Sequence, residues 1–279
     1  MQQAYTLSTE ELRTLQLIEL EILMEIDRIC RKNRIYYSLT GGTLLGAVRN
    51  GGFIPWDDDA DVSMLRCEYI KFQQACKTDL DTERFYFQDI DNTRGYRWGY
   101  GKLRRKNTIF LRKNQEHMPY EQGVFVDIFP RDGIPDGRII AEIHAFCCFA
   151  VRKIMWSPIG QKTADNKCQR VIYMLLAKIP EGAMKRMYHL LVAASSNRHT
   201  ELVRALTFPL PDGQKGYKRN WYMKYTQVEF EKIKFMAESS YKEWLWTEFG
   251  DYMQLPPMKK RKTHPVTRLK LINLGNEGI

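Results

Sequence analysis

The sequence predicts an α+β fold, in which a small mixed β-sheet is flanked by helices and followed by a basic helical lobe. Segments of strand length alternate with helical periodicity through the first 138 residues. Three apolar stretches of helical length then follow one another between residues 139 and 194. The net charge of +10 is uneven, because residues 1–140 hold 20 basic and 21 acidic side chains whereas residues 141–279 hold 23 and 12.

These changes of character divide the chain into three parts. We expect a core over residues 1–138, a basic helical lobe over residues 139–225, and a segment over residues 226–279 that returns to the core and ends in a basic tail. The hydrophobic content of 44% and the aromatic content of 12% are typical of an ordered globular protein and exclude a disordered chain.

The first predicted element is a long amphipathic helix that packs on the sheet. Ser8 or Thr9 caps it, and apolar residues recur at helical spacing as far as Asn33. Periodicity and turn residues predict the remaining elements. We expect strands over residues 36–40, 59–62, 85–89, 98–104, 109–111 and 124–129, and helices over residues 43–49, 69–77, 139–156, 171–179 and 184–194, with a last helix ending at Gly250.

Four carboxylates crowd into five positions near the end of GGTLLGAVRNGGFIPWDDDADV, residues 41–62. Carboxylates so close repel one another unless they share a cation. Strand alternation places Asp59 and Asp61 on one face, where both can bind Mg²⁺, which takes oxygen ligands from carboxylates and substrate phosphates. Asp57 shares that face, and we expect it to hold the metal ligands in place without binding the metal directly. Asp58 points the other way and caps a helix or turn.

Two glycines stand where the strand over residues 36–40 gives way to the next helix. Bare backbone amides at a helix N-terminus can hold a phosphate. We therefore expect Gly41, Gly42 and Thr43 to contact a phosphate, with Arg49 at the end of the same helix as a cation. A phosphate site so close to a metal pair predicts phosphoryl-transfer chemistry.

Asp127 interrupts the short apolar strand over residues 124–129. A carboxylate inside an apolar strand is costly unless it is paired or binds a metal. We therefore expect Asp127 to be a third metal ligand beside Asp59 and Asp61. The alternative is a structural role, in which Asp127 caps a loop or pairs with Arg131.

Cations and aromatic residues alternate in the segment GYRWGYGKLRRKNT, residues 95–108. Lys102 and Arg104 share a strand face and are the preferred phosphate contacts; the alternative is a solvated basic edge. Trp98, between Tyr96 and Tyr100, can hold a quaternary ammonium by cation–π attraction. Ordinary packing of the aromatic residues in the core is the alternative.

The glycine pair followed by Asp-x-Asp resembles the signature of the nucleotidyltransferase fold. With Arg49, Gly51-Gly52 and IPWDDDADV, the fuller pattern resembles the LicD family of phosphocholine transferases. GVFVDIFPRDGIP at residues 123–135 and FGDYMQLPPMKKRKTH at residues 249–264 extend this resemblance. It implies a nucleotidyltransferase-like core with two Mg²⁺ (or Mn²⁺) ions, and it places Arg261 and His264 at the edge of the site. A surface position in the basic tail is the alternative for His264.

The same resemblance implies an activity. The protein would move phosphocholine, or a similar phospho-alcohol, from CDP-choline or a related CDP-alcohol to a sugar hydroxyl of a lipopolysaccharide, teichoic acid or other glycan precursor, and release CMP. One alternative is a nucleotidyltransferase that places a nucleotide on a small acceptor. A second is a noncatalytic scaffold at the membrane surface, against which the intact acidic and glycine motifs argue.

The basic lobe and the cysteines suggest where the protein works. Apolar helical faces edged with Lys and Arg are typical of helices that lie on an anionic membrane; the alternative is a lobe packed on the core. Six cysteines without metal-binding spacing, the absence of a signal-peptide pattern and the absence of an apolar run of ~20 residues indicate a cytoplasmic protein, or one peripheral to the inner face of the membrane. We expect no nucleic-acid partner.

Overall fold

The computed structural model describes residues 4–196, 200–211 and 213–272. Its first helix, α1 (Thr9–Asn33), follows Ser8, whose hydroxyl accepts a hydrogen bond from the backbone N–H of Glu11. The Glu11 carboxylate in turn accepts one from the backbone N–H of Ser8. This capping box satisfies two N–H groups that the start of a helix leaves free, so the predicted start of the helix is confirmed.

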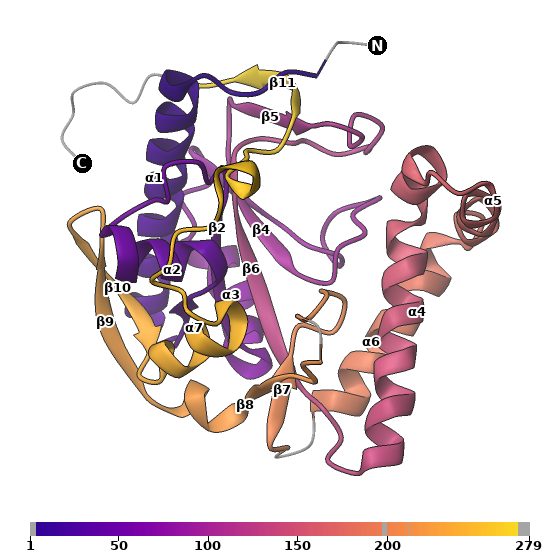
Figure 1. Cartoon of the computed structure of the whole chain (residues 1–279). Coiled ribbons are helices and arrows are strands. Elements are labelled where there is room, and N and C mark those ends of the chain that lie inside the picture. The colour runs from indigo at the N-terminus through magenta and orange to yellow at the C-terminus, as the bar shows by residue number, and fades with distance from the viewer. Residues whose placement is uncertain (1–3, 197–199, 212, 273–279) are drawn as a thin grey trace.

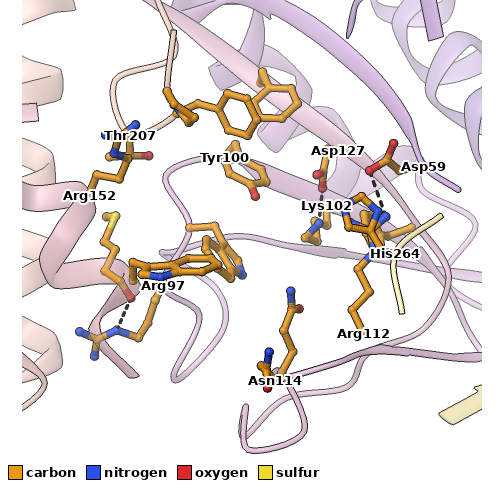
Figure 2. Close-up of a pocket in the computed structure, with 18 of the residues that line it drawn as sticks. Asp59, Arg97, Tyr100, Lys102, Arg112, Asn114, Asp127, Arg152, Thr207 and His264 are labelled. Carbon is orange, nitrogen blue, oxygen red and sulfur yellow. Dashed lines mark hydrogen bonds and ion pairs between the residues drawn. The ribbon is translucent and has the colours of Figure 1, made fainter. Parts of the chain in front are cut away.

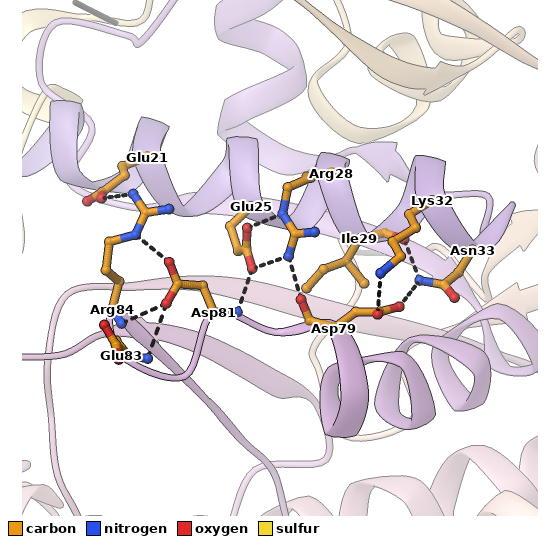
Figure 3. Close-up of polar contacts among 10 residues, drawn as sticks. All are labelled: Glu21, Glu25, Arg28, Ile29, Lys32, Asn33, Asp79, Asp81, Glu83 and Arg84. Atoms are coloured by element: carbon orange, nitrogen blue, oxygen red, sulfur yellow. Dashed lines mark hydrogen bonds and ion pairs between the residues drawn. The ribbon is translucent and has the colours of Figure 1, made fainter. Parts of the chain in front are cut away.

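One face of α1 is buried and the other carries polar contacts. Its apolar stripe, which includes Leu15, Ile18, Ile22 and Ile26, is fully buried. On the polar face, Lys32 pairs with Asp79 at the end of α3 (Arg66–Asp79), and a second ion pair joins Glu21 to Arg84 (Figure 3). The helix is therefore held to the sheet by apolar burial and to its neighbours by polar contacts.

The central sheet is mixed. Its strands lie in the order β1 (Ser38–Leu39), β2 (Ala60–Leu65), β6 (Phe125–Gly133), β4 (Gly101–Arg105) and β3 (Phe85–Gln88). Strands β2 and β6 run parallel, and the other neighbours are antiparallel. The second half of β6 also pairs with β7 (Leu202–Arg204), which pairs with β8 (Tyr217–Lys218). The parallel pair at its centre confirms the predicted mixed sheet.

Residues of the C-terminal part of the chain, among them Phe230, Trp244 and Val266, belong to the main hydrophobic core. A hairpin of β9 (Tyr225–Phe230) and β10 (Ile233–Glu238) leads into α7 (Tyr241–Phe249), which ends at Gly250 with φ +67°. Strand β11 (Val266–Lys270) then pairs with β5 (Ile109–Arg112) in a separate two-stranded sheet. Short 3₁₀ helices cover Arg219–Met223 and Met258–Lys260.

The helical lobe consists of α4 (Arg138–Thr163), α5 (Lys167–Leu176) and α6 (Glu181–Ser196). In Figure 1, these helices stand on one side of the sheet, opposite α1, α2 (Gly41–Asn50) and α3. Helices α4 and α6 share a small apolar core with Ile90 and Tyr96. No helix in the described part of the chain is both long enough and apolar enough to cross a bilayer.

Four predicted strands begin later in the chain than expected, and two of them are β1, which begins at Ser38, and β6, which begins at Phe125. The strand expected from residue 98 begins at Gly101, because Arg97 and Trp98 turn toward α4: the Arg97 guanidinium donates to the carbonyls of Ile154 and Met155. The strand expected from residue 59 begins at Ala60 and runs on to Leu65. Asp59 is therefore the residue just before β2.

Candidate active site

A cavity of about 740 Å³ lies between the sheet and α4 (Figure 2). Acidic residues from β2 and β6 line it on one side, and Arg152 and Trp156 from α4 line it on the other. The loop after β7 and the segment before β11 complete the wall with Phe208 and His264. The helical lobe is thus part of this wall and does not stand apart from the core.

The three carboxylates expected to bind metal lie together in this cavity. Asp61 and Asp127 are register partners on the parallel strands β2 and β6, so adjacent strands place them side by side. Asp59 precedes β2 by one residue and also lines the cavity. Neighbouring strands therefore bring together residues that are far apart in the sequence.

Two buried cations already contact this acidic group. The Lys102 ammonium pairs with Asp127, and Lys102 and Asp127 are also register partners on β4 and β6. The Arg112 guanidinium lies 3.0 Å from an Asp59 oxygen and 3.7 Å from an Asp58 oxygen. Burial lowers the pKa of Lys102 to about 8, although the charge of Asp127 opposes this shift. Burial would raise the pKa of Asp59, but the charge and hydrogen bond of Arg112, together with the charges of His264 and Lys102, hold that pKa below its ordinary value.

The remaining carboxylates repel one another. Burial, followed by the charges of neighbouring carboxylates, raises the pKa of Asp61 and of Asp57 well above the ordinary value. Burial also raises the pKa of Asp127 despite its contact with Lys102. Carboxylates with raised pKa values in one cavity form a site where a divalent cation would offset the repulsion, so the residues fit a hard metal ion with oxygen ligands.

A second possible metal-binding group shares Asp59 with the first. The ligand atoms of Asp58, Asp59 and His264 lie within 4.8 Å of one another, a spacing that could hold a metal ion. The buried Asp58 accepts hydrogen bonds from the His264 ring, at 2.7 Å, and from its backbone N–H, at 3.0 Å. Asp58 thus anchors the C-terminal segment to the acidic loop, and the structure places His264 at the cavity.

Gly41 and Gly42 leave room for two carboxylates beside the start of α2. At Gly41, where φ is +58°, a Cβ atom would lie 2.9 Å from the nearer Asp61 oxygen. A Cβ at Gly42 would collide with the Asp57 carboxylate. The start of α2 therefore faces protein carboxylates, which its dipole favours. Gly41 and Asp61 also line a smaller pocket of about 60 Å³ that adjoins the main cavity.

Several predicted phosphate contacts are placed differently by the structure. The Thr43 hydroxyl accepts a hydrogen bond from the backbone N–H of Asp61, which joins α2 to β2. Arg104 does share a strand face with Lys102, but it is buried and its guanidinium donates to Gln88 and to the carbonyl of Gly123. Its hydrogen bonds are used inside the protein, because the strand carries it away from the cavity.

Arg49 and Arg261 also lie outside the described lining of the cavity. Arg49 donates to the carbonyl of Tyr252, so it ties the end of α2 to the C-terminal segment. Arg261 lies 4.8 Å from the centre of the Trp56 ring and donates to the carbonyl of Pro256. Both cations are therefore placed to hold the C-terminal segment on the core.

The aromatic wall includes Trp98 but not Tyr96. Trp98 lies 5.7 Å from Trp156 of α4 and 6.2 Å from Tyr100, measured between ring centres. Tyr96 is completely buried in the core of the lobe, so it cannot share an open aromatic face with them. Residues 96–98 lie before β4 and have no regular structure, and strand alternation therefore does not apply there.

Pro158 helps to position Trp156. A proline lacks the N–H that would bond the carbonyl four residues earlier, which here belongs to Ile154. Arg97 donates to that carbonyl at 2.9 Å and Ser157 at 2.7 Å. These two donors satisfy the free carbonyl of Ile154, and the contact with Arg97 fixes α4 against the segment that carries Trp98.

Sequence reasoning missed three contributors to the site. Arg112 gave no signal, because a basic residue at the end of a short strand is common on surfaces. Glu19 did give one, since it lies on the apolar stripe of α1; it is buried, and burial followed by the charge of Asp59 raises its pKa well above the ordinary value. Phe208 lies in a loop, and only the tertiary structure brings it to the cavity.

Comparison with known proteins agrees with this geometry. Residues 34–138 match the family described as LicD/FKTN/FKRP, nucleotidyltransferase domain. The lipopolysaccharide cholinephosphotransferase LicD of Haemophilus influenzae is 30% identical over 264 residues, which cover 91% of this chain and 96% of that protein. The chain belongs to the LicD family.

Two other relatives match parts of this LicD-family chain. An uncharacterized protein of Rickettsia typhi is 43% identical over 54 residues, which are 19% of this chain and 18% of that protein. An uncharacterized protein of Rickettsia prowazekii is 28% identical over 117 residues, or 42% of this chain and 40% of that protein.

Proposed function

We propose that this LicD-family protein transfers phosphocholine from CDP-choline to a sugar hydroxyl of a cell-surface glycan precursor, such as a lipopolysaccharide or teichoic acid precursor. The observation that carries the proposal is the group of three cavity carboxylates on and beside two parallel strands, faced by aromatic and basic residues. The similarity to the lipopolysaccharide cholinephosphotransferase of Haemophilus influenzae supports choline as the alcohol. A similar CDP-alcohol is the closest variant of the proposed donor.

The reaction replaces the phosphoanhydride bond of CDP-choline by a phosphate ester bond to the acceptor. The acceptor hydroxyl oxygen forms a bond to the phosphorus that bears choline, and its proton is released to solvent. The bond from that phosphorus to the bridging oxygen breaks, and the electron pair leaves with CMP. Because attack occurs at the phosphorus that carries the alcohol, CMP is the leaving group.

Asp59, Asp61 and Asp127 would hold Mg²⁺, with two ions expected and Mn²⁺ as a substitute. When bound, the metal neutralises charge on the phosphates and stabilises the attacking and leaving oxygens. Lys102 and Arg112 hold the orientation of Asp127 and Asp59 and add positive charge beside the phosphates. Trp98 and the other aromatic rings exclude water from the cavity.

The second candidate is nucleotidyl transfer, in which the acceptor attacks the α-phosphorus and keeps the nucleotide. The nucleotidyltransferase-domain match supports this chemistry equally well. A noncatalytic scaffold is less well supported, because a scaffold has no need of buried carboxylates that raise one another's pKa values.

Isotopic labelling separates these functions. CDP-choline is labelled either in choline or in cytidine and incubated with the protein, Mg²⁺ and a glycan acceptor. We expect choline label on the acceptor and cytidine label in free CMP. Cytidine label on the acceptor would establish nucleotidyl transfer instead, and no transfer with any CDP-alcohol would favour the scaffold.

A further inference from the structure

Three aromatic rings meet at the side of the cavity that carries the carboxylates. Ring centres lie 4.6 Å apart for Tyr100 and Phe129, 4.9 Å for Phe129 and Phe208, and 6.1 Å for Tyr100 and Phe208. The ring plane of Phe208 is inclined at 66° to that of Phe129 and at 80° to that of Tyr100, so the rings form a corner. All three line the cavity, and we call them the aromatic corner.

The chain ties the aromatic corner to the reacting groups. Phe129 lies two residues after Asp127 on β6, so both side chains point to the same face of the sheet. Figure 2 shows Tyr100 between Asp127 on one side and Arg152 on the other. Phe208 and Phe129 also line the small pocket beside Asp61. The corner therefore adjoins the acidic group, whereas Trp98 contacts Trp156 on the α4 side.

The chemistry of the corner favours a cation without hydrogen-bond donors. Ring faces carry negative potential, and the neighbouring carboxylates add to it. A cation already occupies this environment, since the Lys102 ammonium lies 3.4 Å from the centre of the Phe125 ring and 5.5 Å from that of Tyr100. Phe208 remains 43% exposed although its ring packs against that of Phe129, so its surface is available to a ligand.

We infer that the aromatic corner of Tyr100, Phe129 and Phe208 binds the quaternary ammonium group of the donor. The inference rests on the proposed function, in which the phosphorus that reacts also bears choline. Only one oxygen and two carbons separate that phosphorus from the ammonium nitrogen. The ammonium must therefore lie beside the carboxylates, where the corner is, and not at Trp98, which was the candidate from sequence.

Binding measurements with matched ligands test this assignment. The ligands are CDP-choline, its neutral analogue with a tert-butyl group in place of the trimethylammonium, and CMP, each with Mg²⁺ in a calorimeter. In Phe208→Leu the side chain stays apolar but loses its ring, so we expect binding of CDP-choline to weaken about 5- to 30-fold. Binding of the neutral analogue should change much less, and binding of CMP should not change.

Three further variants, Phe129→Leu, Phe146→Leu and Trp98→Leu, complete the design. Phe129→Leu, on β6, should also weaken binding of CDP-choline more than binding of the other two ligands. Thermal melting verifies that this variant is folded. Phe146→Leu removes an exposed ring on α4 outside the cavity and should leave all three affinities unchanged. Equal losses for the three ligands, no loss in either corner variant, or a larger choline-specific loss in Trp98→Leu would overturn the inference.

The same experiment tests the proposed function separately. If the wild-type protein binds CDP-choline no more tightly than CMP, the proposed donor is wrong, whatever the variants show. Wild-type protein that prefers CDP-choline to the neutral analogue, with unaffected corner variants, would overturn only the location of the ammonium site.

Discussion

Asp61 is the residue on which the most constraints converge. Its backbone N–H is held by the Thr43 hydroxyl, its carbonyl accepts from Thr40, and its carboxylate lies against Gly41. Burial and three neighbouring carboxylates raise its pKa well above the ordinary value. The ion pairs of the described residues include none for Asp61, whereas Asp59 is paired with Arg112.

This contrast gives different predictions for two isosteric substitutions. Asp61→Asn and Asp59→Asn should each lower turnover at least about a hundredfold, because each removes a charge from the metal site. Without metal, Asp61→Asn should raise the melting temperature, since it relieves repulsion. Asp59→Asn should lower it, because the buried Arg112 loses the nearer of its two carboxylate partners.

Label transfer and thermal melting measure the two effects. Asp165→Asn, at an exposed position between α4 and α5, is the matched control and should change neither. Wild-type turnover in Asp59→Asn or Asp61→Asn would remove the metal-ligand assignment.

Among the elements, the hairpin of β9 and β10 supports the strand that precedes the glycine pair. Glu238 at the end of β10 is buried beside the hydroxyl of Ser38 on β1, and its second oxygen has no hydrogen-bond partner among the described residues. Burial raises the pKa of Glu238 to about 8, although Arg131 opposes the shift. The folded protein therefore holds a proton on Glu238 that the unfolded chain releases near the ordinary pKa.

Stability should consequently fall as pH rises. The folded state binds more protons between the ordinary pKa of Glu238 and about 8, so the contribution of this group is fully present below that range and lost as pH rises through it. Glu238→Gln mimics the protonated form. We expect its free energy of unfolding to exceed that of the wild type by on the order of 5 kcal/mol at pH 9, and by only about 1 kcal/mol at pH 5.

Urea unfolding of both proteins at pH 5, 7 and 9 measures this difference. Glu243→Gln changes an exposed carboxylate in the first turn of α7 and is the control. Parallel pH profiles for wild type and Glu238→Gln would contradict the buried proton.

At the scale of the whole molecule, the helical lobe has an inner side and an outer side of different character. Its inner side lines the cavity through Arg152 and Trp156. Its outer side exposes large apolar residues on α4 and α5 together with basic residues. The exposed apolar residues are Ile139, Ile140, Ile143, Phe146, Phe149, Val171, Ile172, Met174 and Leu175. We propose that this outer surface contacts an anionic membrane that carries a lipid-linked acceptor.

Liposome co-sedimentation tests the membrane proposal. The protein should bind anionic vesicles and be released as salt rises, because charges in water are screened within about 10 Å at 0.1 M. The double variant Ile172→Ser and Leu175→Ser should weaken binding. Met223→Ser changes an exposed apolar residue outside the lobe helices and should leave binding unchanged. Equal binding to neutral and anionic vesicles, or none to either, would contradict the proposal.

Much of the fold and part of the site followed from local patterns. The capped helix α1, the helices of the lobe and the end of α7 at Gly250 depend on periodicity and turn chemistry, which neighbouring residues determine. Asp59, Asp61 and Asp127 were also recognisable, because carboxylates crowded together or set in an apolar strand are costly without a partner.

Only the tertiary structure decided which side chains face the cavity. Arg104 and Lys102 have the same local pattern, yet Gln88 and Gly123 bind Arg104 inside the protein while Lys102 reaches Asp127. Trp156 and Phe208 come from the lobe helix and a loop, and no spacing rule links them to β6. The physical reason is that backbone periodicity depends on adjacent residues, whereas the partners of a side chain depend on which distant segments pack beside it.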